Sequence, residues 1–492
     1  MSRIIIQNGN MCELDLPLKF AQKLYAEFAI RHPNAFYLRT RQRGMQNWDG
    51  KIHYINKHGE FKIGLLPAVY EKCTEYGIKP KVVDMRQPLP KVSKVVTKIG
   101  EYKLRPEQEK AVKAVINNKV GKVPFQIGVL DYTVNAGKTL IMSSLYLSYK
   151  KQLKTLLITN DSDWLNQARD EFKKYLPGEQ ITFVQGKVLN WSNFTIGMVQ
   201  SISRNMRFYQ NELAKVDMVL VDEADQAGSK QYQNVLTRLF NTRVRIGLSG
   251  TIYMSKLAKD KVKNTNLEVF FGKVLAEFKL KDSIKKGYST RTIVKMVPSK
   301  PWYGNWESEE VSYKEVYDDS ITFNKYARKM VYDRLKWNIK QGRYPALVVC
   351  KFIAHCEKLC KYFKKKLGSK YNIACVHVDT PSKIRQQIMK DFREGKIDIL
   401  VSTTIIARGK NFPKLRYLLN AASMDSQEKS IQFLGRLVRT DSSKKKVYLD
   451  DLHYPGPYLN RHGKHRKQYY QKQELKVILL EKIWKNHPIH SL

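Results

Sequence analysis

The sequence predicts an α/β protein built around two parallel-sheet domains. At 492 residues, the chain exceeds the roughly 250 residues at which a single hydrophobic core stops growing, so two to four domains are expected. Short apolar runs alternate with helical segments over residues 100–275, and the same alternation returns after residue 290. Buried parallel strands have this composition because crossover helices cover both faces of their sheet.

Residues 1–88 form the first predicted domain, a small α+β unit. Its expected elements are a strand at 3–7, a helix at 18–31, strands at 51–55 and 61–65, and a helix at 67–76. The stretch 82–98 is extended in character, because Pro88 and Pro90 lie among many β-branched residues. We therefore predict a linker at 89–100, sheet domains at 101–275 and 276–454, and a short basic helical extension at 455–492.

The clearest predicted strands are short apolar runs. They lie at 155–158, 218–221 and 244–248 in the first sheet domain, and at 346–350 and 397–401 in the second. No short tandem repeat accompanies them, so the repetition lies at the level of two similar domains.

The charge balance is strongly basic. Lys and Arg number 88 against 45 Asp and Glu, which gives a net charge of +43. Such a surplus attracts polyanions, and nucleic acid is the expected partner. Host lysine usage or solubility is the alternative. The spread of basic residues from Arg39 to Lys467 favours a long binding track instead.

Cysteines and apolar runs narrow the class of protein further. The six cysteines lack the paired spacing of a zinc site, and no secretory context supports disulfides. Cys356 and Cys360 share one helical face, where packing is the expected role. No apolar run approaches the ~20 residues that span a bilayer. We expect no membrane association and a reducing, cytoplasm-like compartment.

The tripeptide Gly137-Lys138-Thr139 indicates a phosphate loop. It lies between an apolar run at 127–130 and a helical segment that begins at Leu140. In this setting the N–H groups of the helix N-terminus receive phosphates, Lys138 reaches the terminal ones, and the Thr139 hydroxyl binds Mg²⁺.

Two residues depart from the GxxxxGK pattern. Tyr132 stands at its first glycine, and Asn135 stands where another glycine is common. Asn tolerates left-handed backbone conformations, so the loop is still expected to form.

Asp222 and Glu223 follow directly after the apolar run at 218–221. Carboxylates at the carboxyl end of a parallel strand lie where open α/β sheets bind ligands. Asp222 is expected to hold the Mg²⁺ shell, and Glu223 to orient or deprotonate the attacking water.

Two later motifs extend the pattern. Ser249-Gly250-Thr251 also closes a strand, and its hydroxyls are expected to relay hydrogen bonds from the carboxylates to the next domain. Gln432, Arg436 and Arg439 fall at i, i+4 and i+7 of a helical stretch, so they share one face. An arginine delivered across a cleft can neutralise charge that develops during phosphoryl transfer.

In this order the motifs resemble those of the superfamily-2 helicases, over residues 100–452. The further segments that carry the resemblance are Leu104-Arg105-Pro106-Glu107-Gln108, Ser402-Thr403-Thr404 and Ala407-Arg408-Gly409-Lys410-Asn411-Phe412-Pro413. The resemblance implies two RecA-like domains with ATP between them and nucleic acid across their tops.

The resemblance also implies roles for individual residues. Gln108 would contact the adenine, aided by Arg105, although a polar residue on a helix is the alternative. Gly409 and Asn411 would lie near the nucleotide, with Asn411 in place of the usual aspartate, and Thr403 near the nucleic-acid strand. The implied nucleotide site comprises Arg105, Gln108, Asn135, Ala136, Gly137, Lys138, Thr139, Leu140, Gly409 and Asn411.

The choice between DNA and RNA depends on the remaining letters. Asp222-Glu223-Ala224-Asp225 spells the DEAD motif of RNA helicases, yet the chain has Ile158-Thr159-Asn160-Asp161-Ser162 where those enzymes carry a PTREL-like segment. Gln432 also replaces their usual His. The chain is therefore more similar to the DNA-acting branch that contains RecG, XPB and the phage UvsW helicases.

Short flanking segments support the same branch. Asn47-Trp48-Asp49-Gly50-Lys51-Ile52 and His462-Gly463-Lys464-His465-Arg466 are similar to the ends of UvsW-type proteins. Residues expected to contact DNA in the N-terminal unit are Arg39, Arg41, Arg43, Trp48 and Lys51. A core role for Trp48 and a merely solvated charged face are the alternatives.

We predict an ATP- and Mg²⁺-dependent DNA helicase that unwinds or branch-migrates forked and Holliday-type DNA in phage recombination, replication or repair. It is expected to act as a monomer, with recombination or single-strand-binding proteins as candidate partners. The open alternatives are an RNA helicase or remodelling ATPase, a duplex translocase, and an ATP-gated annealing protein.

Overall fold

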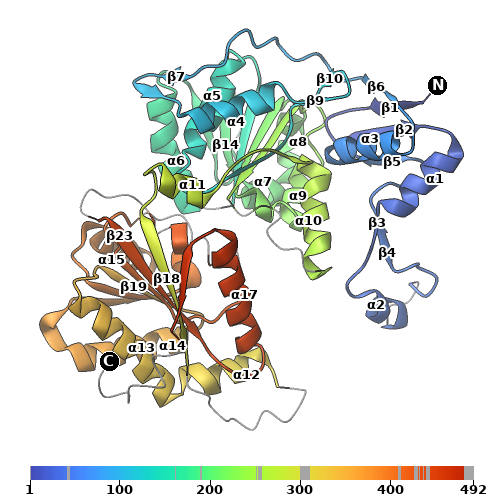
Figure 1. The fold of residues 1–492 in the computed structure, drawn as a ribbon. Helices are drawn as coiled ribbons and strands as arrows, with labels where there is room; N and C mark the ends of the chain where they lie inside the picture. The colour runs from blue at the N-terminus through green and yellow to red at the C-terminus, as the bar shows by residue number, and fades with distance from the viewer. Residues whose placement is uncertain are drawn as a thin grey trace. The chain divides into compact units, whose positions relative to one another are not determined.

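The computed structural model describes most of the chain. The described residues are 2–41, 45–160, 162–188, 191–250, 252, 258–299, 311–407, 412–425, 430, 433–435, 437–438 and 444–480. The chain divides into two compact units, Met1–Phe278 and Lys279–Leu492, which are drawn in Figure 1. Each unit is described by itself.

A seven-stranded parallel sheet forms the centre of the first unit. Its strands are β11 (Ile127–Tyr132), β12 (Thr155–Thr159), β13 (Ile181–Val184), β14 (Phe194–Met198), β15 (Met218–Asp222), β16 (Val244–Ser249) and β17 (Val274–Phe278). They lie in the order β13-β14-β12-β15-β16-β11-β17. The strands predicted at 155–158, 218–221 and 244–248 are confirmed.

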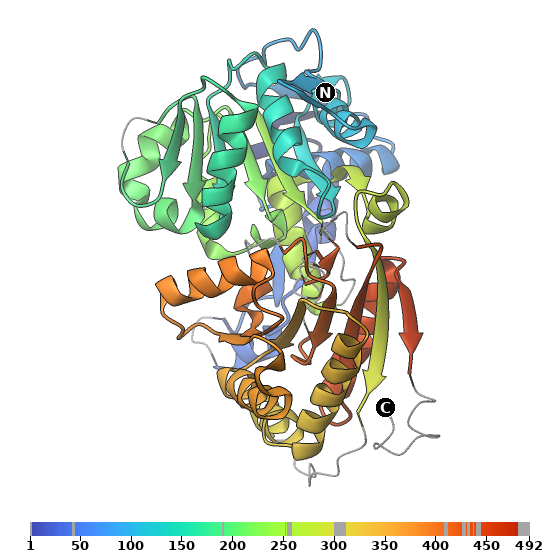
Figure 2. The same ribbon diagram turned by 90° about the vertical axis from the view of Figure 1, so that its left-hand side faces the viewer.

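Helices cover both faces of this sheet (Figures 1 and 2). They are α4 (Pro106–Ile116), α5 (Lys138–Ser148), α6 (Ser162–Tyr175), α7 (Val199–Arg204), α8 (Met206–Ala214), α9 (Lys230–Leu236) and α10 (Ala258–Phe271). This cover explains why β11, β12, β15 and β16 are buried along their whole length.

The second unit repeats the architecture. Its strands are β18 (Arg291–Pro298), β19 (Ala346–Cys350), β20 (Ile373–Val376), β21 (Ile399–Thr403), β22 (Tyr417–Asn420), β23 (Lys446–His453) and β24 (Lys476–Leu479). Their order is β20-β21-β19-β22-β23-β18-β24. When each sheet is numbered from its own first strand, both orders read 3-4-2-5-6-1-7. The two similar α/β domains are confirmed.

The helices of the second unit connect these strands. They are α11 (Leu280–Lys285), α12 (Tyr313–Tyr317), α13 (Lys325–Lys340), α14 (Ile353–Leu367), α15 (Ser382–Glu394) and α17 (Leu459–Lys472). The segment after residue 455 was expected to be helical only. It contains α17, but β24 then adds a strand beside β18, because half-buried Val477 and Ile478 complete that edge of the sheet.

The N-terminal segment is an α+β unit, as expected. Strands β1 (Arg3–Ile6), β2 (Met11–Asp15), β5 (Glu60–Lys62) and β6 (Lys81–Asp84) form one sheet, with α1 (Leu18–Glu27) and α3 (Leu66–Glu75). The helix predicted over 18–31 ends at Glu27, because Ala29–Arg31 pairs as β3 with β4 (Lys51–His53). Between them lies α2 (Ala35–Arg41).

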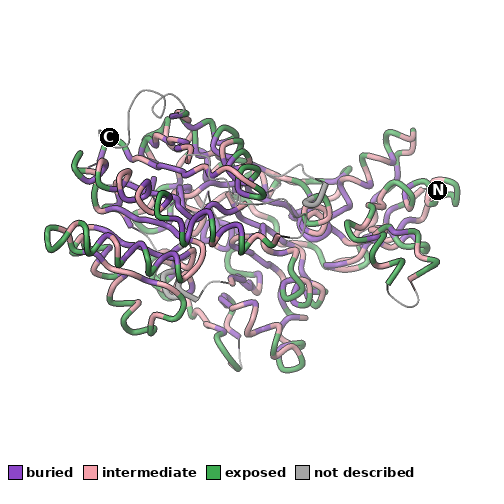
Figure 3. The backbone as a smooth tube through the Cα atoms, turned by 90° about the horizontal axis from the view of Figure 1, so that it is seen from below, coloured by how far each residue is buried: buried purple, intermediate pink, exposed green. Residues whose placement is uncertain are grey.

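The apolar core of this segment is continuous with that of the first sheet. Ile4, Ile6 and Leu66 belong to the same buried cluster as Val219 and Phe271, and buried stretches run through both parts, purple in Figure 3. Backbones also approach closely: a Cβ at Gly9 would lie 2.6 Å from the Leu239 carbonyl oxygen, and one at Gly64 would lie 2.3 Å from that of Glu268.

A buried arginine joins the same two parts. Arg245 of β16 is fully buried, and its Nη2 donates to the Gly9 carbonyl at 2.8 Å and to Asn10 Oδ1 at 2.6 Å. Burial, with Arg86 nearby, lowers the pKa of Arg245 to about 9. The N-terminal segment is therefore anchored to the sheet by polar as well as apolar contacts.

The cysteines and the helices bear on metal-binding clusters and membrane spans. Cys356 and Cys360 are buried free thiols, and the described residues contain no group of three or more His, Cys, Asp or Glu side chains that could hold a metal ion. Within the described part of the chain, no helix is long and apolar enough to cross a bilayer.

Candidate functional site

The loop between β11 and α5 adopts the conformation that a phosphate loop needs. Asn135 has φ 63° and Gly137 has φ 71°, so both lie in the left-handed region. The expectation that Asn135 can replace glycine there is confirmed. No side chain caps the N-terminus of α5, so the N–H groups of its first turn, which includes Lys138, Thr139 and Leu140, are suited to an anion.

Two side chains of the α4 region hold this loop. Arg105 Nη1 donates to the Asn135 carbonyl at 3.1 Å, and Gln108 Nε2 donates to the Ala136 carbonyl at 2.8 Å. Gln108 Oε1 accepts from the Arg105 N–H at 2.8 Å. A Cβ at Gly137 would lie 2.3 Å from Gln108 Nε2 and would displace this amide, and the left-handed φ of Gly137 also favours glycine. The contact of Gln108 with adenine stays a prediction.

Tyr132, the departure from the glycine pattern, is the last residue of β11. Its ring is fully buried, and its hydroxyl donates to the Glu107 carbonyl at 2.6 Å. Burial raises the pKa of Tyr132 above the ordinary phenol value, which keeps this donor protonated. A side chain at this position therefore ties β11 to α4.

The carboxylate of Asp222 faces the lysine of the loop. β15 ends at Asp222, whose Oδ1 lies 3.4 Å from Lys138 Nζ. Burial acts to lower the pKa of Lys138, but the carboxylates of Asp222 and Glu223 outweigh it and raise the pKa above its ordinary value. Lys138 is thus a fixed cation beside the loop.

Glu223 is held in an unusual backbone conformation. Its φ is 51°, in the left-handed region, and its Oε2 accepts from Gln226 Nε2 at 3.3 Å. Asn160 in turn donates to Gln226, and Gln200 Nε2 donates to the Asn160 carbonyl at 3.1 Å. Strained backbone of this kind is often found at functional sites. The sequence interpretation did not identify Gln226 or Gln200, and no spacing signal marks them.

Ser249 contacts one of the carboxylates, while the predicted relay of hydrogen bonds from the carboxylates to the next domain stays a prediction. The Ser249 Oγ donates to Asp225 Oδ1 at 2.7 Å, and both residues are buried. A Cβ at Gly250 would lie 2.9 Å from the Thr133 Cα, so the β16 end packs closely on the loop. Thr251 lies outside the described residues.

The residues of this edge fit a nucleotide with its metal. Asp222 Oδ1 is buried and accepts no hydrogen bond from the described residues, and an unshared carboxylate oxygen is a ligand that Mg²⁺ prefers. Thr139 would supply the second protein oxygen.

Fewer predicted residues can be placed in the second unit. Thr403 ends β21 and is buried, and its carbonyl accepts from the Ser402 hydroxyl at 3.0 Å. Its contact with nucleic acid stays a prediction. Gly409, Asn411, Gln432, Arg436 and Arg439 lie outside the described residues, as does Arg43 in the first unit.

The N-terminal segment contains a basic cavity. Its volume is about 600 Å³, and its lining includes Arg31, Phe36, Arg39, Asp49 and Lys51. Arg39, Arg41 and Lys51 are exposed, and Phe36 is 79% exposed. The sequence interpretation missed Phe36, although an aromatic residue among arginines is the pattern of a nucleic-acid surface.

Trp48 directly precedes Asp49, which lines this cavity. It is partly buried, its Nε1 donates to the Lys51 carbonyl at 2.9 Å, and its ring meets His32 edge-on at 5.6 Å. Its indole N–H is thus occupied within the protein.

Comparison with known proteins defines the class. The conserved C-terminal domain of helicases matches residues 328–441, and the res subunit of type III restriction enzymes matches residues 101–254. With the two parallel-sheet domains, these matches show that the chain belongs to the superfamily-2 helicases, a class of enzymes that hydrolyse ATP.

Individual relatives are distant. The chain is 22% identical over 382 residues to a protein assigned as helicase 22 of Sulfolobus islandicus filamentous virus, which covers 72% of this chain. The chain spans 65% of the length of that curated relative.

Two solved structures are also similar. Dbp5 of S. cerevisiae, bound to RNA and ADP BeF3, is 14% identical with a TM-score of 0.53, over 78% of this chain and 91% of that one. UvsW of T4 is 18% identical with a TM-score of 0.45, over 97% of this chain and 98% of that one. At these identities, the likeness to Dbp5 concerns the fold alone.

Proposed function

We propose that the protein is an ATP-dependent DNA helicase of the UvsW type that unwinds or branch-migrates forked and Holliday-type DNA. The observation that carries the ATPase part is the pairing of Lys138 with Asp222 beside an uncapped helix N-terminus. A loop cation, a strand-end carboxylate and unused backbone donors are the groups that hold a triphosphate and its metal.

In this proposal each residue of the first unit has one task. Lys138 and the first-turn N–H groups of α5 bind the terminal phosphates, and Thr139 with Asp222 holds Mg²⁺. Glu223 orients the attacking water, and its left-handed backbone sets the direction of its side chain. Mg²⁺, when bound, neutralises charge on the phosphates.

The second unit supplies the remaining cations in this proposal. Gln432, Arg436 and Arg439 share one helical face by sequence spacing, and an arginine there stabilises the charge of the transition state. Arg439→Ala should lower the rate of ATP hydrolysis on the order of 10³-fold, measured by phosphate release with saturating forked DNA. Normal hydrolysis by this variant would contradict the assignment.

The assignment to DNA rests on sequence features. The PTREL-like segment is absent, and Asn47-Trp48-Asp49-Gly50 resembles the UvsW-type N-terminal unit. In the proposed organisation, residues 1–88 bind DNA through Arg39, Arg41, Arg43 and Lys51, and the basic cavity beside Phe36 receives a phosphate or an unpaired base.

Substrate choice is tested directly. ATP-dependent unwinding of forked DNA, a Holliday junction and a matching RNA duplex should be measured in parallel at stated salt, since phosphate contacts make affinity salt-dependent. Faster unwinding of branched DNA is expected. Faster unwinding of RNA would favour the RNA-helicase alternative, which the DEAD motif at Asp222 to Asp225 supports. Translocation without strand separation would favour a duplex translocase, and tight binding with negligible turnover an annealing protein.

The N-terminal surface has its own test. Arg39→Ala or Lys51→Ala should each lower the slope of log affinity against log salt by about one phosphate contact, measured by fluorescence anisotropy with forked DNA. Lys119→Ala is a control, since Lys119 is exposed on the first sheet domain. An unchanged slope in both N-terminal variants would remove this surface from the proposal.

A further inference from the structure

The surface of helices α13 and α14 is strongly basic. α13 carries six Lys and Arg against one acid, Asp333, and α14 carries five Lys against one acid, Glu357. Both acids already have partners: Asp333 Oδ2 lies 2.6 Å from Lys329 Nζ, and Glu357 Oε1 lies 3.4 Å from His377 Nε2. The remaining cations therefore create a field that attracts an anionic partner.

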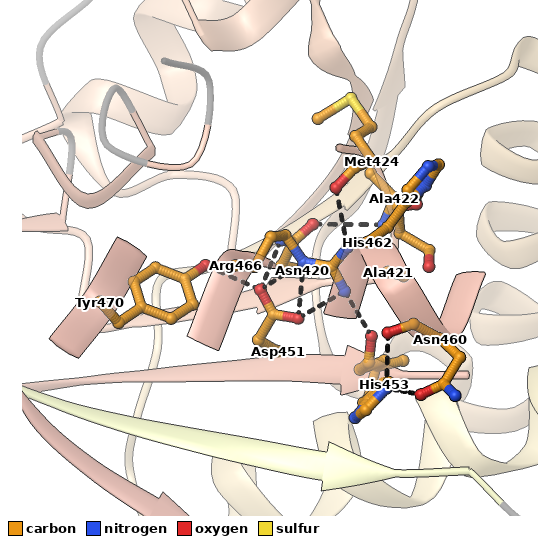
Figure 4. Close-up of polar contacts among 12 residues, drawn as sticks. Asn420, Ala421, Ala422, Met424, Asp451, His453, Asn460, His462, Arg466 and Tyr470 are labelled. Atoms are coloured by element: carbon orange, nitrogen blue, oxygen red, sulfur yellow. Dashed lines mark hydrogen bonds and ion pairs between the residues drawn. The ribbon is translucent and has the colours of Figure 1, made fainter. Parts of the chain in front are cut away.

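The paired arginines of the second unit do not contribute to this field. Arg466 is fully buried, and its Nε and Nη2 donate to Asp451 Oδ1 at 3.0 and 2.9 Å (Figure 4). Arg334 of α13 donates through Nε to Asp450 Oδ2 at 2.8 Å, and the Tyr417 hydroxyl donates to the same oxygen. Each guanidinium is thus neutralised within the protein, and the charge offered to a partner comes from exposed side chains.

Two exposed aromatic residues lie among these cations. Phe323 is 57% exposed and Tyr326 is 56% exposed, more than any other aromatic side chain described in the second unit. A partner for such a surface must offer flat apolar groups and negative charge together. Nucleobases on a phosphate backbone have this chemistry.

The backbone holds both rings in place. Phe323 follows the π-helical turn Asp318–Thr322, and its N–H donates to the Asp318 carbonyl at 2.8 Å. Asn324 then caps α13, because its Oδ1 accepts from the Tyr326 N–H at 2.9 Å. π-helical turns are frequent at functional sites, and a surface that is already ordered loses less entropy on binding.

Ring contacts place α13 and α14 side by side (Figure 1). Lys358 Nζ lies 4.8 Å from the centroid of the Phe323 ring, and the Arg328 guanidinium lies 5.6 Å from that of Tyr362. Tyr332 meets Tyr362 edge-on at 5.6 Å. These contacts advance in the same direction along both helices, so the cations of α14 and the aromatic residues of α13 form one continuous surface.

The lysines of α14 are spaced for a phosphate backbone. Lys358, Lys361 and Lys365 are exposed and fall at i, i+3 and i+7, so they share one helical face. They span about 10 Å along the helix, which accommodates about three phosphates at the ~3.4 Å axial spacing of one strand. A duplex keeps its bases stacked on one another, whereas an unpaired strand offers base faces and phosphates together.

We propose that an unpaired DNA strand binds this surface, the α13–α14 face, made by Phe323, Tyr326, Arg328, Lys358, Lys361 and Lys365. The two rings stack on bases, and the cations contact phosphates. The proposed function assigns no DNA contact to α13 or α14, and only the choice of DNA over RNA rests on it. Because every base has a flat face, binding should tolerate any sequence.

The aromatic residues are tested on the full chain without nucleotide. Phe323→Ala combined with Tyr326→Ala should lower the affinity for labelled oligothymidine at least about fivefold, the loss expected when one stacked base loses its ring. Affinity for a blunt duplex of the same length should change less than about twofold, since its bases are paired. Fluorescence anisotropy measures both. Tyr344→Ala is the matched control: Tyr344 is 40% exposed in the same unit but lies outside the face, so this variant should keep the wild-type affinity.

The lysines have a separate test. Lys358→Ala, Lys361→Ala and Lys365→Ala in one chain should lower the slope of log affinity for oligothymidine against log salt by about 0.7 for each lost phosphate contact. Lys340→Ala with Lys370→Ala is the control, because both lysines are exposed in the same unit outside the face. An unchanged slope in the triple variant would overturn the inference.

Photochemical cross-linking identifies the contact directly. A strand that carries 5-iododeoxyuridine should label Phe323 or Tyr326 after irradiation, as mapped by mass spectrometry of peptides. No label there, with unchanged affinity of the aromatic variant, would overturn the inference and leave the face to an acidic protein. Tighter binding of oligouridine than of oligothymidine would overturn the choice of DNA. Cross-linking in a wild-type chain that does not hydrolyse ATP would remove the proposed function and leave this inference standing.

Discussion

The fifth and sixth strands end in polar residues in both sheet domains, yet the two sets behave differently. In the first, β15 ends at Asp222, whose Oδ1 lies 3.4 Å from Lys138 Nζ and accepts no hydrogen bond from the described residues. In the second, β22 ends at Asn420, which donates to a carboxylate, Asp451, that Arg466 already neutralises. One topology therefore leaves a carboxylate oxygen without a hydrogen bond from the described residues at Asp222, and gives both oxygens of Asp451 hydrogen-bond donors.

The largest expected effect is a loss of stability when a buried carboxylate of β23 loses the arginine with which it is paired. Arg466→Met and Arg334→Met each leave a buried carboxylate without its cation, and each should lower the free energy of unfolding of the second domain by about 3–5 kcal/mol. Urea denaturation followed by circular dichroism measures this. If Arg466→Met left the stability unchanged, Asp451 would have to find another partner. The contrast between Asp222 in the first sheet and Asp451 in the second would then be contradicted.

The next effect is a loss of ATP hydrolysis when Lys138, which faces Asp222 in the first sheet domain, is removed. Lys138→Ala should lower ATP hydrolysis on the order of 10²- to 10³-fold, the range seen when one fixed electrostatic group is removed from a site. Its loss of stability should be smaller than that of Arg466→Met, because the Lys138 side chain is 21% exposed. Full DNA-stimulated activity in phosphate-release assays would show that the phosphate site is misassigned.

An exchange of charge sharpens the comparison. Asn420→Asp should lower the free energy of unfolding by about 1–3 kcal/mol, because it replaces a donor to Asp451 with a second buried carboxylate. Asn338→Asp is the matched variant, since Arg343 Nη1 lies 2.8 Å from Asn338 Oδ1 and can neutralise the new charge. Chemical denaturation should rank Asn420→Asp as the more damaging; the reverse order would contradict this reading of Asp451.

The smallest effect is a loss of stability when the hydrogen bond from Ser249 to Asp225 in the first sheet domain is removed. Ser249→Ala removes one hydrogen bond to buried Asp225 and should lower the free energy of unfolding of the first domain by about 1 kcal/mol. Ser402→Ala, in β21 of the second sheet, is the comparison variant, because its hydroxyl donates to a backbone carbonyl instead. A thermal melt in which Ser402→Ala is the more costly would count against a special role for the Ser249 link.

The sequence could predict what depends on local pattern. β12, β15, β16 and β19 are buried on both faces, so their apolar runs were recognisable. The left-handed Asn135 followed from its residue type. The strand β24 was missed because it is short and only half-buried, and the helix from Leu18 was overextended because the pairing partner of Ala29–Arg31 lies 20 residues further on.

Long-range polar contacts could not be predicted from one sequence. Gln108 was expected near a nucleotide, but its contact with the Ala136 carbonyl depends on how α4 packs against the loop. His462 to Arg466 were recognised only as a family resemblance. The sheet brings them to their partners Ser423, Met424 and Asp451. The spacing of these residues along the chain does not predict the contacts.

The shared core of the N-terminal segment and the first sheet has a mechanical consequence. The two parts are in close contact through the hydrogen bond from Arg245 to the Gly9 carbonyl and through the tight backbone packing at Gly9 and Gly64. Residues 88–97 lack regular secondary structure, but Val96, just before β7 (Lys98–Ile99), is hydrogen-bonded to Ser144 and Ser148 of α5. The N-terminal segment should consequently move together with the first sheet domain as one rigid body. Any rotation of that domain would then displace a molecule bound to the N-terminal segment by the same angle.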